Sequence, residues 1–206
     1  MDRYGLIGFP LKHSFSAKFF AEKFRREGID AEYLHFEIED IHEIRQIIQF
    51  NQTVKGLNVT IPYKEQVIPF LDKISPEAQK IGAVNVIKVE RREGDLYFYK
   101  LTGYNTDYIG FKRSLAPLIN PASHKKALIL GTGGASKAVA QALTDLQIHW
   151  RYVSRTPGAD RFTYADLSPE IISDHTVIVN ASPVGTFPEV NHCPNIPYAL
   201  LTPRHL

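Results

Sequence analysis

The sequence predicts an α/β protein with one mixed and one parallel sheet. In the first half, short apolar runs alternate with stretches of helical periodicity and end in a hairpin pattern. In the second half, a strand pattern runs directly into a glycine-rich turn and a helix. A polar break containing Pro121 separates them. We therefore expect an N-terminal mixed-sheet α/β domain over residues 1–120 and a C-terminal Rossmann-type, doubly wound parallel sheet over residues 121–206.

The first half alternates strands and helices along the chain. Phe20 and Phe24 recur at helical spacing, and Gly28 stands where a helix-ending glycine belongs. Pro62 suits the first turn of a further helix. The expected strands are residues 4–9, 33–38 and 56–60, the helices are 16–27, 41–50 and 63–71, and the hairpin joins 84–89 to 96–101.

The second half has the pattern of a βαβ unit. A long helix is expected from about residue 105 to 118; an alternative is that this helix is a hinge shared by both domains. The expected strands are residues 127–130, 149–154 and 177–180, with a helix over 136–146. Strand–helix alternation of this kind is typical of a doubly wound sheet.

Composition excludes several classes of protein. With 206 residues, 44% apolar and 22% charged, the chain is long enough for one large or two small domains. A net charge of +2 gives no support for nucleic-acid or membrane binding. The single cysteine, Cys193, excludes an intrachain disulfide and a cysteine-rich zinc site, and we expect no metal. Without an apolar run of about 20 residues or a signal-peptide pattern at the start, the expected location is cytoplasmic.

The glycine turn lies directly between a strand and a helix. Residues 131–136 read Gly-Thr-Gly-Gly-Ala-Ser, with Ser136 at the third glycine position of the dinucleotide-binding pattern. Glycines permit a tight turn and let a pyrophosphate approach the backbone, while the helix N-terminus supplies free N–H groups. The turn predicts dinucleotide binding; the alternative is a turn that serves only strand–helix packing.

The end of the next strand indicates which dinucleotide is bound. An acidic residue there would bond the ribose 2′-hydroxyl of NAD, but this chain has Ser154, Arg155 and Thr156. An arginine suits bidentate contact with a phosphate, so NADP is favoured. The alternative is that Arg155 is a solvated loop residue.

Polar groups gather in four short segments of the first half. Open α/β sheets bind ligands beyond the carboxyl ends of their strands, and hydroxyls and carboxamides suit a ligand rich in hydroxyl groups. The residues are Ser14 and Ser16, then Asn58, Thr60 and Lys64, then Asn85, and finally Asn105, Thr106 and Asp107.

Each of these positions has a structural alternative. The serines, Asn105 and Thr106 could be helix caps, and Asn58 and Asn85 could satisfy buried backbone groups. Lys64 could be a surface lysine and Asp107 a first-turn carboxylate. Spacing alone does not bring the four segments together.

In this order, ahead of the glycine turn, the segments closely resemble the shikimate dehydrogenase family. The resemblance covers nearly the whole chain and rests on residues 4–8, 10–16, 56–64, 81–85, 103–110, 131–136, 154–156 and 180–185. It implies NADP-linked interconversion of 3-dehydroshikimate and shikimate, a step towards chorismate and the aromatic amino acids, by a monomer or homodimer.

The resemblance also implies roles for individual residues. Lys64 and Asp107 match the family's catalytic pair, and both would contact substrate. The other substrate-contacting positions match Ser14, Ser16, Thr60 and Asn85, with Asn58 in the same motif. The phosphate loop matches Gly131, Thr132, Gly133, Gly134, Ala135 and Ser136, and the segment that binds the 2′-phosphate matches Ser154, Arg155 and Thr156.

Three features depart from the family pattern, two residues and the extent of the chain. Ser154 replaces the usual asparagine, and Val86 stands where threonine is common. Family members also continue beyond the position of Leu206, into a further strand, a nicotinamide-side loop and helices that carry a substrate-contacting glutamine. We therefore expect the nucleotide-binding domain to be truncated at its C-terminus.

Three other functions fit parts of the sequence. A regulatory NADP-binding module would keep the glycine turn without using Lys64 and Asp107. A quinate or shikimate dehydrogenase using NAD would favour an acidic residue at position 154. A methylene-tetrahydrofolate dehydrogenase would need more aromatic residues to stack on a pterin than these segments offer.

Overall fold

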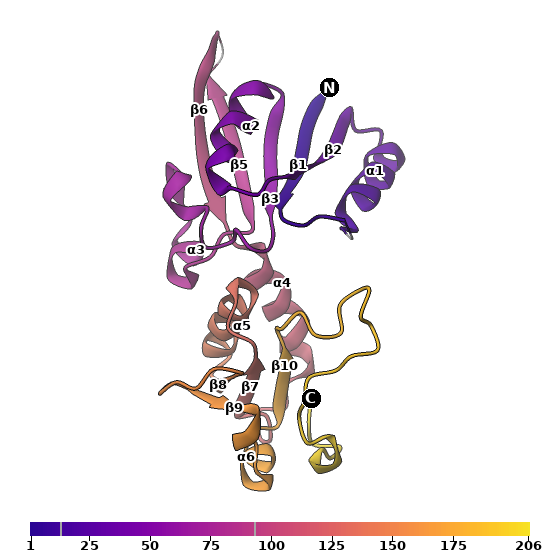
Figure 1. Ribbon diagram of the computed structural model, residues 1–206, viewed down its shortest axis with the longest axis vertical. Helices are drawn as coiled ribbons and strands as arrows, with labels where there is room; N and C mark the ends of the chain where they lie inside the picture. The colour runs from indigo at the N-terminus through magenta and orange to yellow at the C-terminus, as the bar shows by residue number, and fades with distance from the viewer. Residues whose placement is uncertain (13, 93) are drawn as a thin grey trace. The chain divides into compact units, whose positions relative to one another are not determined.

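The chain forms two compact units, Met1–Thr106 and Asp107–Leu206, in a computed structural model that describes residues 1–12, 14–92 and 94–206 (Figure 1). The division falls at the start of the long helix expected over residues 105–118, rather than after it. The predicted functional boundary between a substrate-binding domain (residues 1–120) and an NADP-binding domain (residues 121–206) stays a prediction.

Six strands of the described chain form the first sheet. They are β1 (Asp2–Gly8), β2 (Ala31–Glu37), β3 (Val54–Val59), β4 (Lys73–Ile74), β5 (Val86–Arg92) and β6 (Asp95–Tyr104), in the order β2-β1-β3-β5-β6-β4. β1 is parallel to β2 and β3, whereas β5 is antiparallel to both β3 and β6. The predicted mixed sheet is confirmed, and so is the β5–β6 hairpin.

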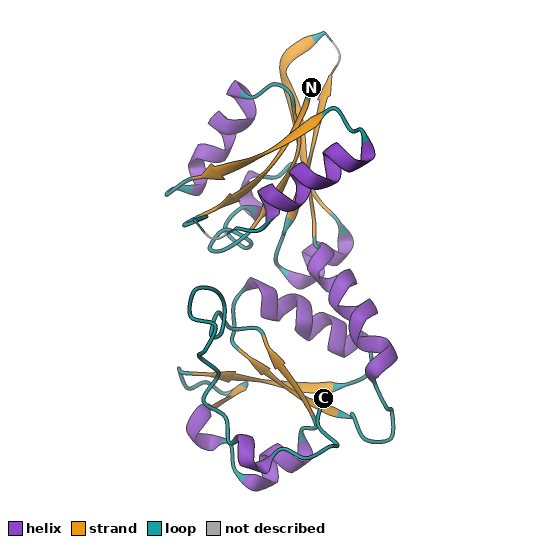
Figure 2. Ribbon diagram, turned by 90° about the vertical axis from the view of Figure 1, so that its right-hand side faces the viewer, coloured by secondary structure: helices purple, strands orange, loops and turns teal. Residues whose placement is uncertain are grey.

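Helices cover both faces of this sheet (Figure 2). They are α1 (Ser16–Glu27), a 3₁₀ turn (Ile41–Glu43) that leads into α2 (Ile44–Phe50), a second 3₁₀ turn (Ile68–Phe70), and α3 (Pro76–Ile81). Successive strand residues point to opposite faces, so Leu6 packs with Phe24 of α1, whereas Ile7 packs with Ile44 of α2. Gly28 ends α1 with φ 64°, as predicted.

The helix predicted over residues 63–71 is wrong. This segment is a series of turns that ends in the 3₁₀ turn. Its backbone and side chains bond to other parts of the unit: the Lys64 carbonyl accepts the Val84 N–H at 2.7 Å, and the buried Tyr63 hydroxyl donates to the Ile38 carbonyl at 2.7 Å. The Val84 bond occupies the carbonyl that the Ile68 N–H would use in a helix, and Ile68 donates instead to the Glu65 carbonyl at 3.2 Å, although the Val67 N–H keeps an i→i−4 bond to the Tyr63 carbonyl at 3.0 Å.

Four strands of the described chain form the second sheet, and all are parallel. They are β7 (Lys126–Leu130), β8 (His149–Ser154), β9 (Arg161–Thr163) and β10 (Val177–Asn180), in the order β10-β7-β8-β9. The remaining elements are α4 (Thr106–Leu115), α5 (Gly134–Asp145), α6 (Pro169–Asp174) and 3₁₀ turns at Ala116–Leu118, Tyr164–Asp166 and Tyr198–Leu200.

The two faces of the second sheet have separate cores. Ile129 packs with Leu143 of α5 and Leu115 of α4, whereas Leu128 packs with Ile172 of α6. Helices on both faces of a parallel sheet confirm the predicted Rossmann-type fold. No helix in the described part of the chain is long and apolar enough to cross a membrane.

Candidate active site

The topology of the first unit brings the predicted polar segments to one edge of the sheet. β1, β3 and β6 run in the same direction and end at this edge, and the antiparallel β5 begins there. The segments that follow β1 and β3 carry Ser16, Thr60 and Lys64; Asn85 precedes β5, and Thr106 follows β6. Sequence spacing alone did not establish that these segments come together. They do so because β5 runs antiparallel to β3 and β6, which places its first residue at the edge where those strands end.

Backbone hydrogen bonds join these segments to one another. The Thr60 N–H donates to the Ile7 carbonyl at 2.9 Å, so the start of the Thr60–Lys64 segment is tied to β1. The bond from Val84 to the Lys64 carbonyl ties its other end to the segment that leads into β5. Lys64 therefore has a fixed backbone although it lies in no regular element.

Asn85 is 7% exposed and bonds to three other segments of the chain. Its N–H donates to the Tyr104 carbonyl at 3.0 Å, and its own carbonyl accepts the Val59 N–H at 2.9 Å. Its side-chain Oδ1 accepts the Thr106 N–H at 2.8 Å, and its Nδ2 donates to the Thr106 Oγ1 at 3.0 Å. Asn85 thus anchors the first residue of α4, and Asp107 follows in the first turn.

The two serines lie at the start of α1. The residue at the N-cap position is Phe15, which makes no side-chain capping bond, and the Ser14 Oγ accepts the Ser16 N–H at 3.3 Å. The Ser14 Oγ thus makes the hydrogen bond of a helix cap although Phe15 holds the N-cap position, so the capping alternative describes Ser14 but not Ser16. Asn58 lies on β3, where its Oδ1 accepts a hydrogen bond from the Tyr33 hydroxyl at 2.8 Å.

Gly8 permits the close approach of β1 to the Thr60 segment. A methyl group at Gly8 would overlap the Thr60 Cγ2 and would lie 2.7 Å from the Leu11 Cδ2 and 3.1 Å from the Ile61 carbonyl oxygen. No larger residue fits without displacing Thr60, so the absent side chain at position 8 helps to set the position of a predicted substrate residue.

The predicted cofactor segments converge in the second unit in the same way. The glycine turn follows β7, and Ser154–Thr156 begin at the end of the adjacent β8. The Gly131 N–H donates to the Val153 carbonyl at 2.9 Å, and Gly131 has φ 107°, a conformation that favours glycine. Gly133 is the N-cap residue of α5, and a methyl group there would meet no heavy atom within 4 Å. The turn therefore leaves space beside the helix N-terminus, as a bound phosphate requires.

The side chains around this turn differ in exposure. Thr132, Ala135, Arg155 and Thr156 are exposed, whereas Ser136 is fully buried and its hydroxyl donates to the Gly133 carbonyl at 2.6 Å. The buried Ser136 hydroxyl therefore stabilises the glycine turn through this hydrogen bond. The exposed Arg155 follows the last residue of β8, where no carboxylate stands.

A polar network attaches α4, which carries Asp107, to α5, which follows the glycine turn. The Asp145 carboxylate accepts hydrogen bonds from the Tyr108 hydroxyl, from Lys112 Nζ at 3.2 Å and from Gln141 Nε2 at 2.7 Å. The Tyr108 bond, together with those from Lys112 and Gln141, holds the pKa of Asp145 below its ordinary value.

Sequence reasoning missed this network and Tyr33. The Tyr108–Asp145 and Tyr33–Asn58 bonds join residues 37 and 25 positions apart, which leaves no local pattern in the sequence.

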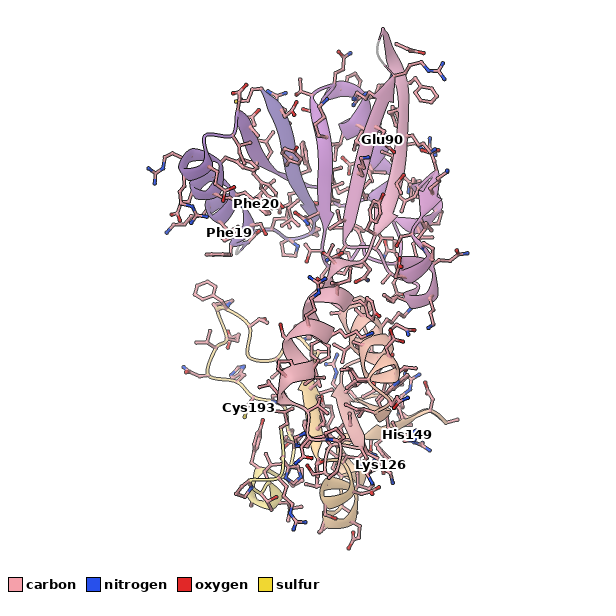
Figure 3. The ribbon with its side chains drawn as sticks, turned by 180° about the vertical axis from the view of Figure 1, so that it is seen from behind. Phe19, Phe20, Glu90, Lys126, His149 and Cys193 are labelled. Atoms are coloured by element: carbon pink, nitrogen blue, oxygen red, sulfur yellow. The ribbon has the colours of Figure 1, made fainter. Side chains whose placement is uncertain are left out.

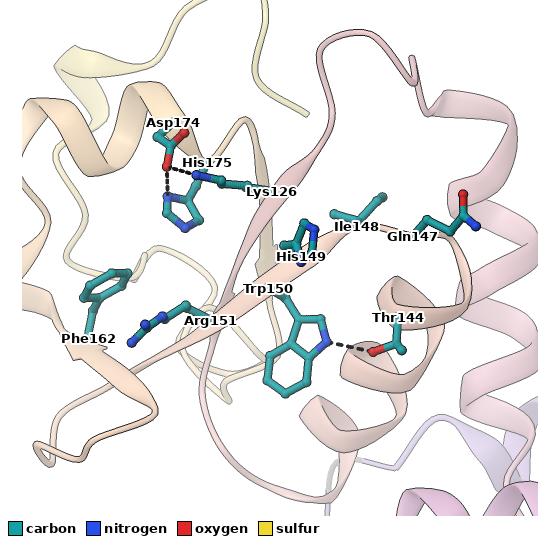
Figure 4. A pocket seen from close by; sticks show the side chains of 10 residues that line it. All are labelled: Lys126, Thr144, Gln147, Ile148, His149, Trp150, Arg151, Phe162, Asp174 and His175. Carbon is teal, nitrogen blue, oxygen red and sulfur yellow. Dashed lines mark hydrogen bonds and ion pairs between the residues drawn. The ribbon is translucent and has the colours of Figure 1, made fainter.

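A separate cavity of about 770 Å³ lies at the amino-terminal edge of the second sheet (Figure 4). Lys126 and His149, the first residues of β7 and β8, line it, and Lys126 pairs with Asp174 at 2.6 Å. None of the predicted site residues lines this cavity. Among the described residues, no group of three histidines, cysteines or carboxylates is placed to hold a metal ion.

Comparison with known proteins identifies the family. Residues 6–87 match the model of the shikimate dehydrogenase substrate binding domain. The shikimate dehydrogenase (NADP(+)) of Aquifex aeolicus is 42% identical over 191 residues, which cover 88% of this chain and 68% of that protein. The chain belongs to the shikimate dehydrogenase family.

Solved structures of the family have the same fold. The crystal structure of the Aquifex aeolicus enzyme has a TM-score of 0.82 at 39% identity, over 100% of this chain and 77% of that one. The Thermus thermophilus enzyme, solved with NADP(H) and shikimate, has a TM-score of 0.77 at 30% identity, over 98% of this chain and 75% of that one.

The Gly8 contact predicts the effect of one added methyl group. Gly8→Ala should displace Thr60, destabilise the first unit by about 1–3 kcal/mol through overpacking and raise the KM for shikimate. Thermal unfolding and steady-state kinetics measure the two effects. Gly110→Ala is the control, since a methyl group at that helical position meets no heavy atom within 4 Å. Unchanged stability and KM in Gly8→Ala would contradict the proposed constraint.

The lowered pKa of Asp145 predicts how the stability of the second unit depends on pH. Because the folded-state pKa lies below the unfolded one, near ~3.9, the stabilisation is fully present above that value and is lost as the pH falls through the folded pKa. The difference in unfolding free energy between wild type and Asp145→Asn should therefore shrink below about pH 4. The fluorescence of Trp150, the single tryptophan, reports unfolding of this unit. A difference that stays constant down to about pH 2.5, well below the unfolded pKa, would contradict this account.

Proposed function

We propose that this chain catalyses the NADP-linked interconversion of 3-dehydroshikimate and shikimate, a step in the biosynthesis of chorismate and the aromatic amino acids. The family it belongs to supports this activity. The observation that carries the proposal is the convergence of the family's polar segments at one edge of the first sheet.

In this proposal the first unit binds a substrate rich in hydroxyl groups. Its contacts come from serine and threonine hydroxyls, two carboxamides and one ammonium group, which together can donate to and accept from several hydroxyls. These residues are Ser14, Ser16, Asn58, Thr60, Lys64 and Asn85. All belong to one unit, so their relative positions are set by a single sheet and its connecting loops.

We assign proton transfer to Lys64 and Asp107. Reduction of a ketone requires a proton on oxygen as well as a hydride on carbon, and bound NADPH supplies the hydride. In this role the Lys64 ammonium donates the proton in the reducing direction, and its amine accepts it in the oxidising direction. Asp107 orients Lys64 or shares the proton with the substrate hydroxyl, and the bonds of Asn85 to Thr106 hold the start of its helix.

The second unit fits NADP. The open space beside Gly133 and the N-terminus of α5 suit the pyrophosphate, and Gly131 to Ala135 would line it. The exposed Arg155 at the end of β8, beside Ser154 and Thr156, would bind the 2′-phosphate. All the residues proposed for substrate and cofactor come from one chain, so the proposed reaction is compatible with a monomer or a homodimer.

The direct test is oxidation of shikimate by the full-length protein, followed by the absorbance of NADPH. NAD and quinate are assayed in parallel. A rate with shikimate and NADP, well above that of any other pair, is the expected result. Measurable NADP binding without turnover of either substrate would instead indicate a regulatory NADP-binding module.

Replacing either member of the proposed pair should slow the chemical step. Lys64→Met should lower kcat about 10²–10⁴-fold, the usual contribution of a positioned acid–base group. Asp107→Asn should also lower kcat, because it removes the carboxylate charge. A Lys64→Met enzyme within tenfold of wild type would exclude Lys64 from proton transfer, and unchanged kcat in Asp107→Asn would exclude Asp107. Stopped-flow measurement of hydride transfer separates chemistry from product release.

Arg155 should determine the preference between the two dinucleotides. Arg155→Ala removes a charged hydrogen bond to the 2′-phosphate, worth about 1.5–3 kcal/mol, so the KM for NADP should rise roughly 10- to 150-fold. The KM for NAD, which lacks this phosphate, should change little and serves as the control. Equal effects on both cofactors would show that Arg155 does not bind the 2′-phosphate.

A further inference from the structure

Tyr33 lies beneath two of the proposed substrate residues without belonging to the family motifs that point to them. It is on β2, 9% exposed, in the apolar cluster that α1 covers. Its hydroxyl donates to the Asn58 Oδ1 at 2.8 Å, and the side chain of Ser16 lies close enough to the phenol to offset part of the pKa rise that burial causes. The hydroxyl therefore joins β2 to β3 across the intervening β1.

The direction of the Tyr33–Asn58 bond follows from the chemistry of the groups. The Asn58 Oδ1 can only accept, so the single phenolic proton is given to it. This bond therefore depends on a neutral phenol. Burial raises the pKa of Tyr33 to about 12, which keeps its proton in place at every pH at which the protein would work.

Packing fixes where the hydroxyl lies. The ring of Tyr33 stacks on that of Phe20, with centroids 4.5 Å apart and planes 10° from parallel, and Phe20 packs against Phe24 at 5.8 Å. Phe20 lies on α1, where Figure 3 labels it. A stacked and buried ring has little rotational freedom, so the phenolic oxygen is a rigid point. The Asn58 carboxamide is held relative to that point by its hydrogen bond to the phenol.

We propose that Tyr33 is a positioning residue for substrate binding, whose hydroxyl orients Ser16 and Asn58 towards the polyhydroxylated substrate. This inference rests on the proposed function. Tyr33 itself does not contact the substrate in this proposal; it acts through the two side chains.

Tyr33→Phe in the full-length protein tests the role, because it keeps the stacked ring and removes only the hydroxyl. The KM for shikimate should rise about 3- to 10-fold, the effect of losing roughly one net hydrogen bond. The kcat and the KM for NADP should stay within twofold of wild type. Tyr4→Phe is the matched control: Tyr4 packs against the same cluster and takes no part in the Ser16–Tyr33–Asn58 arrangement within the described residues.

A mutant cycle separates positioning from a general effect on stability. In a Ser16→Ala/Asn58→Ala background, adding Tyr33→Phe should change the KM for shikimate less than twofold, because the side chains through which it acts are gone. Independent effects would multiply instead. Thermal unfolding of each variant shows whether the fold is preserved.

The outcomes distinguish this role from the proposed function. If wild type oxidises shikimate and Tyr33→Phe has the same KM, the positioning role is overturned and the proposed function stands. An effect of Tyr33→Phe that persists in the double-mutant background, or that is matched by Tyr4→Phe, also overturns it. A wild type that neither binds nor oxidises shikimate overturns both.

Discussion

The arrangement of the candidate substrate site depends on the hydrogen bonds of one asparagine. Asn85 bonds through its N–H to β6, through its carbonyl to β3 and through its side chain to the first residue of α4. Truncating this side chain would remove the acceptor of the Thr106 N–H, a group at the start of α4 that has no partner within the helix itself. The structural and functional interpretations of Asn85 are therefore compatible: a side chain that anchors the helix also lies at the edge where the other polar segments meet.

Much of the fold could be predicted from local pattern. The helix over 16–27 and the strands over 149–154 and 177–180 have the predicted bounds, because each combines clear periodicity with clear end signals. The short elements α3, α6, β4 and β9 were missed, since six residues or fewer carry little periodicity. The predicted helix over 63–71 fails because the bond from Val84 to the Lys64 carbonyl interrupts the helical bonding that Pro62 in a first turn would favour.

The sequence predicted which segments contribute to the candidate site, but not how these segments are arranged in space. Motifs located Lys64, Asn85 and the glycine turn, yet their convergence depends on β5 running against β3, which no local signal specifies. The supporting residues were beyond sequence reasoning for a related reason. Tyr33 looks like any strand tyrosine until its hydroxyl is found beside Asn58, and Asp145 looks like a helix-end carboxylate until α4 is found to pack there.

Apart from Asp107, with which the second unit begins, the division into two units separates the contacts proposed for the two ligands. Arg155 and the glycine turn belong to the second unit, and the hydroxyl and carboxamide groups proposed for substrate belong to the first. Substitutions at the end of β8 would thus alter dinucleotide preference and leave the first sheet, with its Tyr33 and Asn85 supports, unchanged. In evolutionary terms, the choice of electron carrier and the choice of substrate are independently selectable traits in a protein built this way.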